Sequence, residues 1–294
     1  MRFAKKFIVF NLLIFTSLFF GCGGGGGGGS TSDSGTVTLS VTDAKPLLPD
    51  HVENFFVRFS EVWVHKPGEG WIELPLVESP YTIDLLQFYN GFTTELVPPT
   101  KLSSGKYTQV RFVVSSATMG VSDGHGGITE RVVEIPSENL KTDKNFTIDL
   151  GPDAAIDLVA HFDLSQSVVV SGPTSDPTYK LKPVLHLFDD PFTAAIIDGS
   201  ISNSAFGASG KATIVVVAES NGEEYTSVEI TKSTTADSTE YSIFWIVPNQ
   251  EYTVQIDFDQ DDTPDCVLTI GNGDDFESPQ PGEVVDIGTC PEPI

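Results

Sequence analysis

Apolar residues recur at every second position through several stretches of the chain. The clearest runs are Val37 to Val41, Phe55 to Phe59, Val110 to Val114 and Ile156 to Phe162. Successive side chains of a strand point to opposite faces, so this period of two predicts strands that bury one face. Each run is bounded by Gly, Pro, Asn or Asp, which favour turns. We therefore expect an all-β chain built of antiparallel sheets.

Two local irregularities are also expected. The run that begins at Phe55 changes phase near Ser60-Glu61, after which Val62 and Val64 take the buried positions. Such a shift predicts a β-bulge at that point. The segment Ile83 to Phe88 can form a short helical turn, which Asn90-Gly91 would close.

The charge of the chain limits its partners. Its 294 residues include 41 Asp and Glu against 16 Lys and Arg, which gives a formal net charge of −25. Such a surface repels phosphate backbones, so nucleic acid is not expected as a partner. Basic partners and metal cations are favoured, although the solubility of an exported protein would also account for this charge.

The N-terminus has the organisation of an export signal. Arg2, Lys5 and Lys6 precede an apolar run from Phe7 to Phe20. This run is shorter than the ~20 apolar residues of a membrane span and fits the apolar core of a signal peptide. Gly21-Cys22 follows it and resembles the lipobox of bacterial lipoproteins. The resemblance implies a signal peptide at residues 1–21 and a lipid on Cys22; a plain secretory signal is the alternative.

A flexible tether is expected after the cysteine. Residues 22–34 comprise Cys22, seven glycines and a Ser-rich stretch, with nothing to bury in a core. Resemblance to Gram-negative lipoproteins also bears on the location, because Gly23 is not the Asp that tends to retain such proteins in the inner membrane. This resemblance implies lipid anchoring at the outer membrane.

The remaining cysteines form an even pair. If Cys22 carries lipid, Cys266 and Cys290 are left, and an even number in an exported chain predicts a disulfide. A metal site with two cysteines is the alternative, but neither cysteine has a close Cys or His partner in the sequence.

A boundary between two domains is expected near Asp189-Asp190-Pro191. One strand-rich region would cover residues 35–190, and a second would cover 191–294. In the second region the expected strands are Thr213 to Ala218, Ser227 to Thr231, Tyr241 to Ile246 and Tyr252 to Phe258. Their number and spacing suit a small β-sandwich.

The first region resembles a family named only as domain of unknown function 4382, whose members are mostly bacterial lipoproteins. The stretches that carry the resemblance are Leu39–Ala44, Val62–His65, Gly70-Trp71, Ile83–Leu86, Asn90-Gly91, Leu102–Arg111, Ile135–Ser137, Phe162–Ser167 and Leu181–Val184. They occur in this order across about residues 35–190. The family has no agreed activity, so the resemblance implies no catalytic residue.

The second region resembles a transthyretin-like sandwich of the carboxypeptidase-regulatory type. The residues that carry this resemblance are Asp198 to Ile201, Tyr241 to Ile243 and Val247 to Val254. The resemblance implies an accessory or adhesive module and not a peptidase.

One acidic segment has the pattern of a cation-binding loop. It contains Asp257, Asp259, Asp261, Asp262 and Asp265, five carboxylates within nine residues. Alternating carboxylates are how loops surround Ca²⁺ with oxygen ligands, and a divalent cation would relieve their repulsion. The EF-hand pattern is not met. A solvated acidic turn after a strand is the alternative.

Other candidate groups have simpler explanations. His161 and Asp163 share the polar side of one expected strand, and His186 lies on another. A metal site is conceivable, but surface or edge histidines are the more ordinary interpretation. The sequence shows no nucleophile elbow, zinc-protease motif or phosphate loop.

The sequence therefore predicts a lipid-anchored, two-domain, all-β protein of the cell envelope. Its expected role is binding or structural and not enzymatic, with an envelope protein or polysaccharide as partner. The alternative is an envelope hydrolase whose catalytic groups are dispersed in the first domain. A deep pocket lined by acids, His and Trp would favour the hydrolase, and a filled core would favour the binding module.

Overall fold

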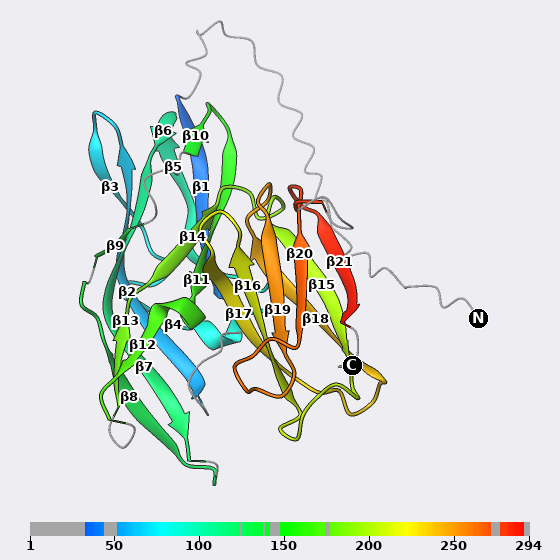
Figure 1. The fold of residues 1–294 in the computed structure, drawn as a ribbon. Coiled ribbons are helices and arrows are strands. Elements are labelled where there is room, and N and C mark those ends of the chain that lie inside the picture. Colours follow the sequence, from blue (N-terminus) through cyan, green and yellow to red (C-terminus); the bar gives the residue numbers. More distant parts are fainter. Residues whose placement is uncertain are drawn as a thin grey trace, which may run out of the picture. The chain divides into compact units, whose positions relative to one another are not determined.

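The computed structural model describes residues 33–43, 52–123, 125–137, 139–141, 148–173, 177–271 and 277–290. Its regular structure within these ranges is 21 strands, one 3-10 turn and one four-residue helix (Figure 1). The prediction of an all-β chain is confirmed.

The first fourteen strands form the sheets of the first domain. Their bounds are β1 (Ser34–Asp43), β2 (Val52–Lys66), β3 (Gly70–Leu74), β4 (Tyr81–Asp84), β5 (Thr94–Ser103), β6 (Gly105–Tyr107), β7 (Gln109–Ser122), β8 (Ile128–Glu134), β9 (Asn139–Lys141), β10 (Ile148–Leu150), β11 (Ala155–Asp163), β12 (Val168–Ser171), β13 (Thr178–Leu181) and β14 (Val184–Phe188).

These strands pair mostly but not entirely antiparallel. One sheet has the order β14-β11-β1-β5, and a larger one follows the path β12-β13-β8-β7-β2-β3, with β4 on β2 and β9 on β7. A two-stranded sheet joins β10 to β6. Parallel pairing occurs between β1 and β11 and between β13 and β8. The sheets are therefore mixed, which the alternation of apolar residues could not reveal.

The core of the first domain lies between the inward faces of these sheets. Three phenylalanines from different strands, Phe59, Phe112 and Phe162, pack edge to face with centroids 5.5–6.1 Å apart. The predicted bulge is present, because the pairing of β2 with β7 shifts register between Arg58 and Glu61. The buried positions change phase there, as expected.

The predicted helical turn is also confirmed. The 3-10 turn η1 (Leu85–Gln87) begins after Asp84, whose side chain accepts a hydrogen bond from the Leu86 amide. Asn90 and Gly91 follow with φ of 56° and 82°. Glycine adopts this left-handed conformation at low cost, and asparagine tolerates it better than most residues.

The second domain contains the remaining strands in two sheets. Their bounds are β15 (Ala195–Ser202), β16 (Lys211–Ala218), β17 (Glu223–Thr231), β18 (Ser238–Ile246), β19 (Tyr252–Asp257), β20 (Cys266–Ile270) and β21 (Val284–Cys290). The sheet orders are β18-β15-β21 and β17-β16-β19-β20. Apolar residues of both sheets enter one core, so this domain is a β-sandwich.

A disulfide joins the two sheets of this sandwich. Cys266 of β20 and Cys290 of β21 are bonded, with their Cα atoms 6.4 Å apart. Both strands are edges of their sheets, so the bond connects the sandwich along one side. The predicted disulfide is confirmed.

No strand among β1–β14 pairs with one among β15–β21 in the sheets that the structure describes. The two domains nevertheless touch, since Val159 and Phe188 pack against Ala194 and Trp245. The predicted boundary near residue 190 falls in the connection from β14 to β15, where Phe192 is 84% exposed. That each side of this boundary folds independently stays a prediction.

Candidate functional site

Three ionisable residues of the first domain lie together where that domain meets the second. His161 and Asp163 are near the end of β11 on one face, and β14 places His186 directly opposite His161. The two imidazole rings are stacked with centroids 6.0 Å apart. We call His161, Asp163 and His186 the polar cluster.

Residues of the second sandwich seal the polar cluster. The ring of Tyr225 on β17 lies 4.8 Å from that of His186, centroid to centroid, and its hydroxyl donates a 2.6 Å hydrogen bond to the carbonyl of Trp245. His161 and Asp163 are 0% exposed. The prediction of surface or edge histidines is wrong for His161, which is buried on the inner strand β11, whereas His186 lies on the edge strand β14 and is half-buried.

Burial dominates the electrostatics of the polar cluster. It lowers the pKa of His186 to about 4 and that of His161 well below the ordinary value, with His186 adding to the second shift. Burial raises the pKa of Asp163 to about 6, against hydrogen bonds that favour its charged form. Desolvation disfavours every charged form, so the two histidines are neutral at neutral pH, whereas Asp163 gains its proton only as the pH falls through about 6.

Among the described residues, the polar cluster does not bring three potential metal-ligand atoms together. Neither ring nitrogen of His161 has a hydrogen-bond partner among the described residues, and the same holds for Nε2 of His186. In the described part of the chain, three potential ligand atoms lie within 4.8 Å of one another in the acidic segment and not in the polar cluster. The stacked rings instead resemble packed core side chains.

The acidic segment brings three of its five carboxylates together. Asp257, Asp259 and Asp265 each have an oxygen within 4.8 Å of the others, a spacing that one cation could bridge. Asp257 ends β19, and Asp259 and Asp265 lie in the connection from β19 to β20. We call residues 257–265 the acidic turn.

Backbone hydrogen bonds shape the acidic turn and use part of its ligand capacity. Asp257 accepts from the amides of Asp259, Gln260 and Asp262, and Asp265 accepts from the amide of Phe258. None of these four amides donates to the carboxylate of Asp259. Desolvation and the neighbouring carboxylates raise the pKa of Asp259. Asp261 accepts from the Thr263 amide.

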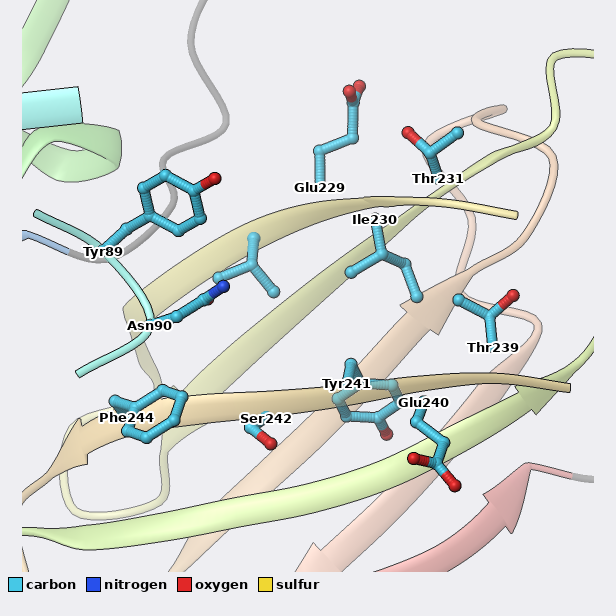
Figure 2. Close-up of a pocket in the computed structure, with 11 residues that line it drawn as sticks. Tyr89, Asn90, Glu229, Ile230, Thr231, Thr239, Glu240, Tyr241, Ser242 and Phe244 are labelled. Carbon is cyan, nitrogen blue, oxygen red and sulfur yellow. The ribbon is translucent and has the colours of Figure 1, made fainter. Parts of the chain in front are cut away.

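A groove opens beside the second sandwich, between strands β17 and β18 (Figure 2). Its volume is about 510 Å³. Val228, Ile230 and Tyr241 contribute apolar surface, and Tyr89 and Asn90 of the first domain line one end. No pattern in the sequence indicates this groove, because only the pairing of strands into sheets reveals which strands are edges.

The predicted lipid attachment lies outside the described residues. Cys22 and the expected signal peptide fall within residues 1–32, so both stay predictions. In the part of the chain that the structure describes, we find no helix with the length and apolar character needed to span a membrane.

Comparison with family models decides the affiliation of the first domain. The model described as "Domain of unknown function (DUF4382)" matches residues 34–183, half of the chain. The chain belongs to the DUF4382 family. The predicted resemblance is confirmed, while the identity of the second domain is not established by this match.

The acidic residues in the DUF4382 stretches have structural roles. Asp43 accepts a hydrogen bond from the Leu164 amide, and Asp84 accepts one from the Phe55 amide. Asp163 accepts from the amide of Gln166 at the start of the helix α1 (Leu164–Ser167). Carboxylates that satisfy otherwise unpaired amides stabilise turns and helix starts. These motifs are therefore explained by the fold.

The DUF4382 match also divides the polar cluster. It includes His161 and Asp163 on β11 but ends before His186 on β14. The tyrosine that covers the cluster comes from the second sandwich. The sealed environment of the DUF4382 histidine is thus a product of both domains.

Other comparisons give weak similarities. No curated protein matches the chain. Among solved structures, the Bacillus anthracis TIE protein is 12% identical over 88% of this chain and 34% of its own, with a TM-score of 0.22. A leucine-rich repeat protein from Bacteroides thetaiotaomicron is 10% identical over 88% and 26%, with a TM-score of 0.23.

The fimbrial anchor protein Mfa2 from Porphyromonas gingivalis is 10% identical over 79% of this chain and 82% of its own, with a TM-score of 0.20. The chain thus spans about a third and a quarter of the first two proteins. TM-scores of this size carry no conclusion about this chain.

Proposed function

We propose that this chain is a non-catalytic binding module of the bacterial cell envelope, anchored through lipid on Cys22. The observation that carries the proposal is the sealing of the polar cluster. A hydrolase needs its acid, base or nucleophile within reach of a substrate. Here His161 and Asp163 are 0% exposed, and Tyr225 of the second sandwich packs against the adjacent His186.

The capping roles of the motif carboxylates support the same proposal. One oxygen each of Asp43, Asp84 and Asp163 accepts a backbone amide of another segment or of a helix start, so these carboxylates have roles in the fold. The groove beside the second sandwich, in contrast, is open and lined by both apolar and polar side chains. An open groove over a filled core suits binding better than catalysis.

The anchoring part of the proposal is tested in cells. Wild-type chain and a Cys22→Ala variant are expressed with radiolabelled palmitate, and the envelope is fractionated. We expect label and membrane partitioning in the wild type and neither in the variant, since two or more acyl chains give stable attachment. Membrane partitioning of the variant equal to that of the wild type would contradict the anchor.

The non-catalytic part is tested against the hydrolase alternative. Purified full chain is incubated with peptidoglycan and with envelope polysaccharide, and soluble fragments are measured. We expect no release above that of a His161→Gln/Asp163→Asn variant. Release by the wild type that this variant loses would establish a hydrolase in the first domain.

We also propose that the acidic turn binds Ca²⁺. Asp257, Asp259 and Asp265 supply hard oxygen ligands at a spacing that suits one cation. Desolvation and then the neighbouring carboxylates raise the pKa of Asp259. Calorimetric titration of the full chain with CaCl₂ should show a dissociation constant of ~10⁻⁴–10⁻³ M, as in other exported modules. An Asp259→Asn/Asp261→Asn variant should show no heat of binding. Equal binding by this variant would contradict the site.

A further inference from the structure

The two lateral sides of the second sandwich differ. On one side the edge strands β20 and β21 are joined by the disulfide between Cys266 and Cys290. On the other side the edge strands are β17 and β18, which belong to different sheets. No covalent bond joins them, and the groove of about 510 Å³ lies between them. We call this side the open edge.

Each strand of the open edge is paired on one side only among the described sheets. β17 pairs with β16, and β18 pairs with β15. Alternate backbone amides and carbonyls of such strands point away from the sheet and are available to another strand. These are the groups that an added peptide strand uses in β-augmentation.

The accessible length of the open edge can be defined. The middle of β17, Tyr225 to Val228, is buried, and helix α1 of the first domain contacts this strand. From Glu229 to Thr231 the strand is partly or fully exposed. In β18 the pairing with β15 is regular from Ser238 to Ile243 and then shifts register before Ile246. Six residues of β18 thus offer a regular edge.

Side chains at the open edge alternate in character along β18. Thr239, Tyr241 and Ile243 are buried, whereas Glu240 and Ser242 are exposed. Figure 2 shows Ile230 of β17 extending into the space between the two strands, whereas the ring of Tyr241 lies across β18 with its hydroxyl directed away from β17, towards Gly199 of β15. A strand added beside β18 would therefore place every second side chain against this apolar surface.

The charge of the groove specifies the other side chains of its occupant. Its lining includes two carboxylates, Glu229 and Glu240, and no lysine or arginine. Glu229 forms a 2.8 Å ion pair with Lys211, whereas Glu240 has no ion-pair partner among the described residues. A second copy of this chain would bring a formal charge of −25 towards the same carboxylates. Like charges facing each other disfavour association.

We propose that the open edge binds an extended segment of a basic partner protein by β-augmentation along β18. Apolar side chains of the segment lie against Ile230 and Tyr241, and lysine or arginine side chains alternate with them beside Glu240. This inference rests on the proposed binding function and names its partner class.

The test uses the full chain and a labelled synthetic peptide. The probe is a seven-residue peptide that alternates valine and lysine, measured by fluorescence anisotropy at physiological salt. Two matched probes accompany it. One replaces lysine with glutamate. The other carries N-methyl groups on all of its amides, so that neither edge of the peptide can donate hydrogen bonds to a strand. We expect binding of the first probe only, because strand pairing needs the amides and the groove repels acidic side chains.

Variants locate the binding. Ile230→Arg should weaken binding by about tenfold or more, since the arginine side chain would occupy the groove and remove its apolar surface. Glu240→Lys should weaken it by roughly three- to tenfold through charge reversal. Val267→Arg and Glu277→Lys are the matched controls, because both residues are exposed and lie outside the groove lining. These controls should bind as the wild type does.

Several results would overturn the inference. They are an absence of binding, equal binding of the N-methylated probe, and equal binding by Ile230→Arg, which would indicate charge attraction alone. Sedimentation that shows a dimer lost in Ile230→Arg would assign the open edge to a second copy instead. None of these results bears on the lipid anchor or on the absence of hydrolysis, so the proposed function is tested separately.

Discussion

The polar cluster and the acidic turn use similar side chains in opposite surroundings. In the cluster, His161 and Asp163 are 0% exposed, and a tyrosine of the other domain packs against the adjacent His186. In the turn, Asp259 and Asp265 are exposed, and a carboxylate at position 257 organises the backbone through three amides. Burial shifts the pKa of Asp163 upwards, while in the turn neighbouring charges add to the shift of Asp259.

This contrast shows that residue type alone does not identify a site. Both groups were candidates for metal binding, because carboxylates and histidines are common ligands. The covering domain turns one group into a packed interface in which the two histidines are neutral and the pKa of the carboxyl is raised. Solvent leaves the other group charged and able to gather around a cation. Solvent access therefore distinguishes the acidic turn from the polar cluster. It depends on which segment, distant in sequence, covers a given strand.

The largest expected effect comes from placing the same charge in both regions. His161→Lys should destabilise the chain by about 4 kcal/mol or more, because it buries a cation without a partner. Asp259→Lys should leave the free energy of unfolding nearly unchanged, since solvent hydrates the new charge. Urea denaturation of both variants measures the difference.

The two variants break the comparison if they behave alike. Comparable loss of stability would mean that the acidic turn is packed, or that the cluster admits water. His161→Gln serves as a control for size, because it keeps polarity without a permanent charge. It should lose less stability than His161→Lys at neutral pH.

The second expected effect concerns the disulfide between β20, the strand that follows the acidic turn, and β21. Cys266 and Cys290 close a loop with a sequence separation of 24 residues. In the chain-entropy treatment a loop of this size contributes about 3–4 kcal/mol to stability. A Cys266→Ala/Cys290→Ala variant should therefore show a lower free energy of unfolding for the second sandwich. An unchanged urea midpoint would contradict a stabilising bond.

The third expected effect is a dependence of stability on pH through the polar cluster. The pKa of His186 is depressed to about 4 in the folded chain, so the unfolded chain binds a proton first as pH falls below about 6.5. The contribution of His186 to stability is complete above about pH 6.5 and is lost as the pH falls towards 4. Between pH 7 and 5 this histidine alone should cost about 2 kcal/mol. His161 acts in the same direction.

Asp163 opposes part of this loss. Its folded pKa is raised to about 6, so its contribution is present below the unfolded value near 3.8 and is lost as pH rises through 6. On acidification from pH 7 to 5 it should return roughly 1 kcal/mol. Glu224 of β17 and Tyr225 also face the cluster, but Tyr225 stays protonated because burial raises its pKa.

Thermal melting between pH 7 and 5 measures the balance. The wild type should lose stability on acidification, and a His161→Gln/His186→Gln variant should show a flat or reversed profile. Asp163→Asn should keep the loss and make it steeper. A wild-type profile that matches the double variant would show that the histidines are not sealed.

Much of the fold could be predicted because the alternation of apolar residues is local. The phase change in β2, the turn η1 and most strands of the second sandwich follow from residues that are close in sequence. The disulfide could be predicted because only two cysteines remained after Cys22. Strands β20 and β21 gave no clear pattern, since both are edges with several exposed apolar or polar positions.

The candidate sites could be predicted only in part. The acidic turn is contiguous in sequence, so its convergence was visible. The polar cluster depends on β17 covering β11, an arrangement between residues more than sixty positions apart that no local pattern encodes. The groove depends on which strands are edges, and parallel pairing of β15 with β21 helps to decide that.

The smallest expected effect links the acidic turn to the disulfide. Asp265 directly precedes Cys266, so the bond holds the C-terminal end of the turn. A held turn loses less entropy when its carboxylates gather around an ion, which favours binding. Millimolar Ca²⁺ should raise the melting temperature of the oxidised chain by about 2–4 °C through mass action on the folded state. Reduction should make this shift smaller, and an Asp259→Asn/Asp261→Asn variant should abolish it. Mg²⁺ at the same concentration is the control for ionic strength. Calorimetry that gives the same shift in the oxidised chain, the reduced chain and the double variant would show that the acidic turn is solvated and that the bond plays no part in cation binding.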